Sequence, residues 1–122
     1  MVPFRDKVST TQVCIDSIRA HAGTTPYELI LIDNGSQEPE TLAWLNEQKK
    51  NADTRIATIN CEFNYAKIHN YARDYCRGNY LLFLNNDIEF KSPDILLQLL
   101  NPFGLNTTTA VGARLLLSLI HI

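Results

Sequence analysis

The chain has 122 residues and a formal net charge of -2, with 45% hydrophobic and 20% charged residues. These values are typical of one globular domain that can bury a real core. A nucleic-acid binder usually carries a basic stripe, so we expect no nucleic-acid partner. No apolar run reaches the roughly 18 residues that a membrane span needs. The three cysteines lack C-x-x-C spacing, which argues against disulfides or zinc and favours a cytoplasmic location.

Hydrophobic patterning in the first half predicts strands that alternate with single helices. Residues 2–4 read as the end of a strand, and a helix follows from Ser9, with Gln12 at capping-box spacing. The near-continuous apolar stretch over residues 27–32 predicts a second strand, which stops at the turn-forming sequence Asp33-Asn34-Gly35-Ser36. Pro39 then opens a second helix, where its missing N–H costs nothing.

The second half continues the same alternation. A short strand is predicted over residues 55–59, a helix over 64–76, a fourth strand over 80–84 and a last strand over 110–117. Ser92 and Pro93 mark a helix start between the last two strands. The fourth strand is unbroken in apolar residues, which indicates burial on both faces. This order predicts a Rossmann-like α/β fold, a mainly parallel sheet with helices on both faces.

Polar residues follow the first, second and fourth predicted strands. Because the carboxyl ends of parallel strands share one edge, a strand order of 3-2-1-4 would open a crevice between strands 1 and 4 there. Asp87 is a hard oxygen ligand suited to Mg²⁺ or Mn²⁺, and Asn85 falls on the same side of an extended chain. Asp33 could accept hydrogen bonds from a base or ribose. Each loop alone is also ordinary turn sequence, and only their meeting at one edge favours a binding site.

Four stretches, in this order, resemble motifs of family 2 glycosyltransferases with the GT-A fold. The resemblance is closest to bacterial, rhamnosyltransferase-like members that decorate polysaccharides. It covers residues 2 to about 116 and rests on Val2-Pro3-Phe4-Arg5-Asp6, on residues 29–36, on residues 63–70 and on Gly78-Asn79-Tyr80-Leu81-Leu82-Phe83-Leu84-Asn85-Asn86-Asp87-Ile88-Glu89, which ends in a D-x-D-like pattern.

The resemblance implies a site for a UDP-, GDP- or dTDP-sugar and a divalent metal, Mn²⁺ or Mg²⁺. Asp87 would bind the metal, and Asn85 stands where many members have a first Asp, which would weaken metal affinity. The other implied contacts are Pro3 and Phe4 against the nucleotide, Asp33 at the base or ribose, Lys67 or Arg5 near the diphosphate, and Asn64, Lys67, Asn70, Asn85 and Asn86 lining the donor pocket.

The same resemblance implies inverting transfer to a saccharide or lipid-linked acceptor in cell-surface polysaccharide synthesis. The general base would come from a second half of the enzyme, so we assign no catalytic residue here and expect this chain to be inactive alone. Residues 1–117 are then an incomplete nucleotide-sugar-binding domain. Residues 118–122 depart from the family pattern, and we interpret them as a non-native or truncated tail. A longer protein could act at the inner face of the membrane.

Two other readings stay open. A receiver-like signalling domain is also a small α/β sheet with acids around Mg²⁺. It needs acids after its first and third strands and a lysine after its fifth, whereas the acidic loops here follow strands 2 and 4. A catalytically inert nucleotide-binding module would carry the same motifs as an enzyme, and the sequence does not separate the two.

Overall fold

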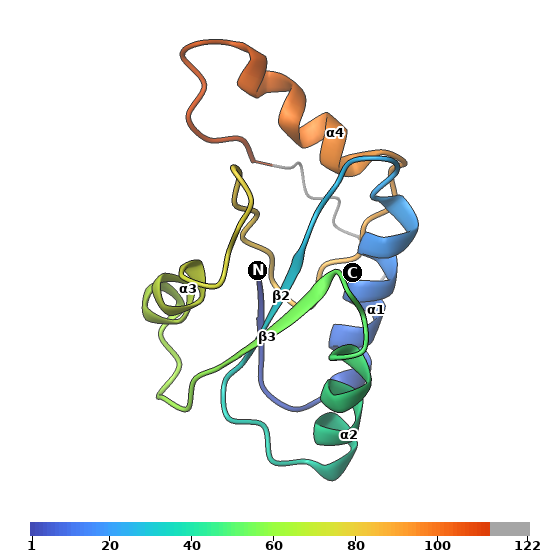
Figure 1. Cartoon of the computed structure of the whole chain (residues 1–122), viewed down its shortest axis with the longest axis vertical. Helices are drawn as coiled ribbons and strands as arrows, with labels where there is room; N and C mark the ends of the chain where they lie inside the picture. Colours follow the sequence, from blue (N-terminus) through green and yellow to red (C-terminus); the bar gives the residue numbers. More distant parts are fainter. Residues whose placement is uncertain (113–122) are drawn as a thin grey trace, which may run out of the picture.

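The computed structural model describes residues 1–112. Three parallel strands form the sheet in the order β1-β2-β3: β1 (Val2–Phe4), β2 (Leu29–Asp33) and β3 (Thr54–Thr58). The register pairs Phe4 with Asp33 and Asp33 with Thr58, so the three strands end level with one another. Their carboxyl ends therefore form the single polar edge that the sequence predicts (Figure 1).

Helices cover both faces of the sheet. The helices α1 (Val8–His21) and α2 (Pro39–Gln48) lie on one face, and α3 (Tyr65–Arg73) lies on the other (Figure 1). Successive residues of β2 alternate between the two cores: Leu29 and Leu31 join the α1/α2 side, while Ile30 and Ile32 join the α3 side. A strand buried on both faces needs apolar residues at every position, which explains its continuous run. The predicted α/β architecture is confirmed.

The segment 80–84 lies beside β1 but forms no regular strand. The Met1 amino group donates a hydrogen bond to the Leu82 carbonyl at 2.9 Å, and the Leu84 N–H donates to the Met1 carbonyl at 3.1 Å. These bonds put the segment next to β1, in line with the expected 3-2-1-4 order.

Burial of this segment on both faces is a wrong prediction. Tyr80 and Phe83 are 56% and 52% exposed, whereas Leu84 is 7% exposed. Among the described residues the segment pairs only with the start of the chain, so several of its side chains face solvent, as at the edge of a sheet.

The capping-box prediction at Ser9 is also wrong. Helix α1 begins at Val8, and Lys7 occupies the N-cap with a left-handed φ of 50° and no side-chain cap. The Gln12 side chain turns away from the helix terminus, donating to Asp16 at 2.7 Å and accepting from the Trp44 indole. The Gln12 side chain thus makes these other contacts and does not form the cap that the local pattern predicts.

The last described elements are short. Helix α4 (Ile95–Leu100) begins two residues later than the Ser92-Pro93 signal places it, with Asp94 at its N-cap, and a 3₁₀ turn, η1 (Asn101–Gly104), follows. Residues 110–112 have no regular structure. The rest of the predicted last strand and the tail 118–122 lie outside the described residues. No helix within residues 1–112 has the length and apolar character to cross a bilayer.

Candidate functional site

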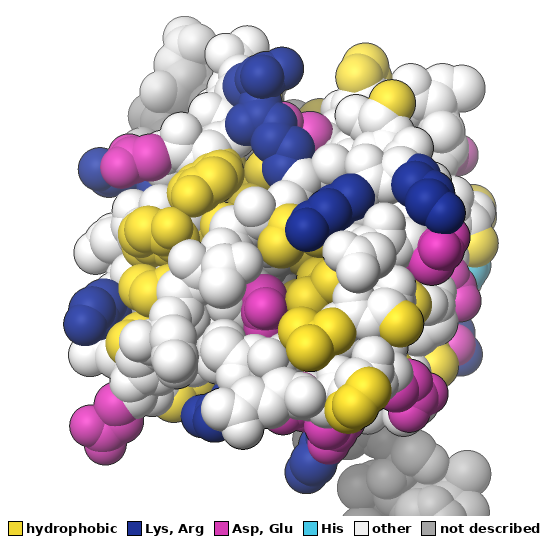
Figure 2. All heavy atoms as spheres, turned by 60° about the horizontal axis from the view of Figure 1, so that its bottom comes forward, with side chains coloured by type: hydrophobic (Ala, Val, Ile, Leu, Met, Phe, Trp, Pro, Cys, Tyr) yellow, Lys and Arg dark blue, Asp and Glu magenta, His cyan; other side chains and the backbone are white. Residues whose placement is uncertain are grey.

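A polar pocket of about 250 Å³ opens at the carboxyl edge of the sheet. It gathers residues from the end of β1, from the chain entering α3 and from the turn after the segment 80–84. Figure 2 looks toward this edge and shows an acidic side chain near its centre, with hydrophobic side chains on either side. The lining residues are Pro3, Phe63, Tyr65, Asn85, Asn86 and Asp87.

The turn that carries Asn85 and Asp87 is anchored on α1. The Asn86 amide donates to the Thr11 hydroxyl at 3.1 Å, and the Cys14 thiol contacts the Asn85 carbonyl oxygen at 3.6 Å. The exposed Asp87 carboxylate forms no ion pair with any residue in 1–112. Burial, with the negative charge of Asp87 as a second cause, raises the pKa of Cys14 to about 11. Asn85 and Asp87 share one pocket, as their spacing predicts.

Asp33, the last residue of β2, lies outside this pocket. Its side chain is largely buried, and one carboxylate oxygen accepts the Ser36 N–H at 2.8 Å, closing a tight turn. Gly35 takes a positive φ of 79° inside that turn. Asn34 connects the turn to the chain on both sides of it. Its N–H donates to the Phe4 carbonyl at 2.9 Å, and its side-chain oxygen accepts the Cys61 N–H at 3.3 Å.

The first-strand residues divide between core and site. Pro3 lines the pocket, but the Phe4 side chain is buried and meets the Trp44 ring edge-on, with centroids 5.7 Å apart. The structure therefore places Phe4 in the α1/α2 core, not against the pocket. Arg5 is exposed on the following loop and does not line the pocket.

The predicted polar residues of α3 do not line the pocket either. The Asn64 side chain caps α3 by accepting the Lys67 N–H at 3.0 Å, and Lys67 and Asn70 are exposed. The lining comes instead from Phe63, which is 69% exposed, and Tyr65. Sequence reasoning missed both. The available signal was their position on either side of Asn64, since neighbours of an extended N-cap point the opposite way.

His69 is a buried residue of α3 that packs against the pocket residue Tyr65. It is buried between Tyr65 and Phe83, with ring centroids at 4.0 and 5.1 Å, and it joins α3 to the segment 80–84. Its Nδ1 lies 2.9 Å from the Tyr65 carbonyl oxygen, while the buried Nε2 has no hydrogen-bond partner within residues 1–112. Burial lowers the pKa of His69.

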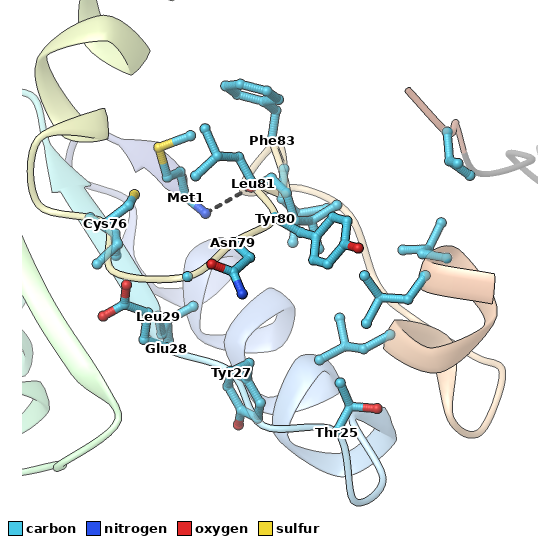
Figure 3. Close-up of a pocket in the computed structure, with 18 of the residues that line it drawn as sticks. Met1, Thr25, Tyr27, Glu28, Leu29, Cys76, Asn79, Tyr80, Leu81 and Phe83 are labelled. Carbon is cyan, nitrogen blue, oxygen red and sulfur yellow. Dashed lines mark hydrogen bonds between the residues drawn. The ribbon is translucent and has the colours of Figure 1, made fainter. Parts of the chain in front are cut away.

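A larger pocket of about 670 Å³ lies elsewhere, lined mainly by apolar residues from the start of β2, the segment 80–84 and α4. Figure 3 shows Met1, Leu29 and Tyr80 around it. Leu29 and Ile30 begin β2, so this pocket belongs to the opposite end of the sheet from Asp33 and Asp87. A donor site needs convergent polar groups, and these meet in the smaller pocket.

Comparison with known proteins decides the family. The model of "Glycosyl transferase family 2" matches residues 1–117. The chain belongs to this family. It is 35% identical over 118 residues to the O-antigen biosynthesis protein RfbC of Myxococcus xanthus, covering 95% of this chain and 9% of RfbC. An uncharacterised protein of Sinorhizobium fredii is 31% identical over 117 residues, covering 94% of this chain and 13% of that protein. The chain thus spans about a tenth of the length of these relatives.

Solved structures agree on the fold. The crystal structure of S. aureus TarS 1-349 matches with a TM-score of 0.60 at 17% identity, over 83% of this chain and 31% of that one. The same protein in complex with UDP matches with a TM-score of 0.62 at 16% identity, over 84% and 31%. At these identities the match establishes a shared fold, in which this family 2 chain corresponds to about a third of the TarS chain.

Proposed function

We propose that the carboxyl edge of this sheet binds the nucleoside diphosphate of a sugar donor, as the donor half of a glycosyltransferase. The observation that carries the proposal is the meeting of Asn85 and Asp87 with Pro3 in one pocket, beside the turn that holds Asp33. Family membership, and the UDP complex of a protein with the same fold, support it.

The residues present suit a cation that is shared with the donor. No group of three His, Cys, Asp or Glu side chains within residues 1–112 could hold a metal ion by itself. Mg²⁺ and Mn²⁺ usually take one or two carboxylates and complete their shell with phosphate and water oxygens. Asp87, with the Asn85 amide oxygen beside it, fits that role, and such a cation would offset charge on the departing diphosphate.

The size of the pocket favours the phosphate end of the donor. At about 250 Å³ it is smaller than the roughly 300–1,000 Å³ of pockets that enclose whole ligands. The base and ribose would then extend over the neighbouring strand ends, toward the turn with Asp33. One Asp33 oxygen is held by Ser36, which orients the carboxylate to accept hydrogen bonds from the nucleoside.

We also propose an acceptor for a longer protein that would contain this chain. RfbC is named for O-antigen biosynthesis, so the acceptor we propose is a saccharide or lipid-linked saccharide of the cell surface, glycosylated on the cytoplasmic side. Inverting transfer needs a base to deprotonate the acceptor hydroxyl. The family resemblance implies that this base comes from a second half of the enzyme, so we propose donor binding without transfer for this chain.

Calorimetry tests the proposal directly. UDP, GDP and dTDP are titrated into the folded 122-residue chain with and without Mn²⁺. We expect one of them to bind weakly and to bind more tightly with Mn²⁺. If a folded sample binds none of the three, donor binding by this chain is ruled out.

A further inference from the structure

We propose that Asp6 is a positioning residue for donor binding, which holds the 33–36 turn in the conformation that presents Asp33. Asp6 follows β1 and is not in the pocket, and the family resemblance gave it no role. The inference rests on the proposed function, because it concerns how the same edge is organised.

A continuous chain of hydrogen bonds joins Asp6 to Asp33. The Asp6 N–H donates to the Ser36 hydroxyl at 2.8 Å. The Ser36 N–H in turn donates to the Asp33 carboxylate at 2.8 Å. Ser36 thus receives a bond from the loop after β1 while it holds the carboxylate after β2. A shift of the Asp6 loop would move Ser36 and with it the orientation of Asp33.

The Asp6 carboxylate also bonds to the residues that follow the same turn. One of its oxygens accepts both the Gln37 and the Glu38 N–H groups at 2.9 Å. These amides precede Pro39, the first residue of α2, and no side-chain cap comes from Glu38 itself. The first N–H groups of a helix need partners from outside it, and an anion there is favoured by charge and helix dipole. Asp6 therefore bonds the two N–H groups just before α2, those of Gln37 and the N-cap residue Glu38, and ties the loop after β1 to the start of that helix.

The backbone of Asp6 shows that this arrangement is held in place. Asp6 and Lys7 both have a φ of 50°, in the left-handed region that few residues other than glycine adopt. Such conformations persist where surrounding contacts enforce them, and they gather at functional sites. Here those contacts are the three Asp6 bonds and the Lys7 N–H, which donates to the Glu38 carboxylate at 3.2 Å.

The test compares three substitutions by titration with UDP in the presence of Mn²⁺, and GDP or dTDP replaces UDP throughout if the wild-type chain binds one of those instead. Asp6→Asn keeps the acceptor oxygen and tolerates a left-handed backbone, so we expect affinity within about twofold of wild type. Asp6→Ala removes the acceptor. If the turn is then competent about one tenth of the time, the apparent Kd rises about tenfold. Asp6→Gly also removes the acceptor but relieves the backbone, and we expect the same loss as for alanine.

Arg19→Ala is the matched structural control. The Arg19 guanidinium donates to Gln48 and Thr54, each at 3.1 Å, where α2 ends and β3 begins, away from the carboxyl edge. We expect it to lower the melting temperature as Asp6→Ala does, but to leave the Kd for UDP unchanged. Equal affinity of Asp6→Ala and wild type, or equal weakening by Arg19→Ala, would overturn the positioning role alone. Absence of nucleotide binding by wild type would instead overturn the proposed function beneath it.

Discussion

At the scale of single residues, Asn85 and Asp87 determine how strongly the pocket would bind a cation. Both line the pocket, and only Asp87 carries a charge. An amide oxygen is a neutral ligand and attracts a divalent ion less strongly than a carboxylate does. The pair therefore predicts a cation site that depends on the phosphate oxygens of the donor.

Exchange of these two side chains gives the first prediction. Asp87→Asn leaves the pocket without a carboxylate, so we expect UDP binding to lose its dependence on Mn²⁺. Asn85→Asp adds a second carboxylate, and we expect Mn²⁺ to strengthen UDP binding more than in wild type. Titration of each variant with UDP, at zero and saturating Mn²⁺, measures both effects. Undiminished Mn²⁺ dependence in Asp87→Asn would show that the ion binds elsewhere.

Gly35 carries the second prediction, because its backbone and its surroundings both require glycine. It has a φ of 79°, and a Cβ there would lie 2.6 Å from the side-chain oxygen of Asn60. We expect Gly35→Ala to lower the free energy of unfolding by about 1–3 kcal/mol. Gly104 is the matched control, because its φ is ordinary and no atom of residues 1–112 lies within 4 Å of the position that a Cβ would take. Urea denaturation should show Gly104→Ala close to wild type, and equal losses in the two variants would contradict the argument.

At the scale of elements, α3 is joined to the segment 80–84 through His69. The imidazole packs between Tyr65 and Phe83, and among the described residues its buried Nε2 has no partner that could stabilise a proton. Burial therefore lowers the pKa of His69 in the folded state below the ordinary 6.5. The contact between these two elements depends on a neutral ring.

The third prediction follows from the direction of that pKa shift. Below pH 6.5 the unfolded chain takes up the proton more readily than the folded chain does, so the His69 contribution to stability is present above 6.5 and is lost as pH falls. We expect His69→Asn, which cannot titrate, to lose less stability than wild type on acidification. Urea denaturation of both proteins above and below that pH measures the difference. Parallel pH profiles would mean that His69 titrates normally.

Contacts between elements also explain why the start of α1 was predicted wrongly. Ser9 and Gln12 have the spacing of a capping box, yet α1 begins at Val8. The two left-handed residues before it, Asp6 and Lys7, turn the chain so that the helix starts at that point. That backbone is held by residues 36–38, about thirty positions away in the sequence. A local pattern carries no information about such a partner, and the tertiary bond prevailed over the local propensity.

For the whole molecule, Cys14 can report on global unfolding. It is buried in the α1/α2 core, whereas Cys61 and Cys76 are half-buried, and the pKa of its thiol is raised to about 11. Only the thiolate reacts with alkylating agents. The fourth prediction is therefore that, near pH 8, Cys14 is alkylated only through unfolding and more slowly than the other two cysteines. Peptide mass spectrometry against urea concentration measures this. Fast labelling of Cys14 in the folded protein would contradict it.

The same shift has a consequence for stability at alkaline pH. The unfolded thiol ionises near 9.0 and the folded one near 11, so the folded state binds the proton more tightly across this interval. The Cys14 contribution is complete below 9.0 and is lost as pH rises toward 11. Cys14→Ala, which has no thiol to ionise, should show a smaller alkaline loss in urea denaturation.

The sequence by itself determined the order of the first three strands and the helices between them, their parallel arrangement and the polar edge. The continuous apolar run of β2 is a local pattern, and so is the abrupt change from apolar to polar residues that leads to Asp87. Local patterns of this kind record which side of a strand is buried. The motifs that contain Asp33 and Asp87 also indicated the family that the comparisons then established.

Only the tertiary structure decided which side chains enter the pocket. Phe4 and Pro3 are neighbours in one motif, yet Phe4 packs on Trp44 in the core and Pro3 lines the site. Phe63 reaches the pocket while Asn64 turns back to cap α3. These outcomes depend on contacts between residues distant in the chain, so they follow from the packed arrangement and not from any local pattern. The role proposed for Asp6 has the same origin.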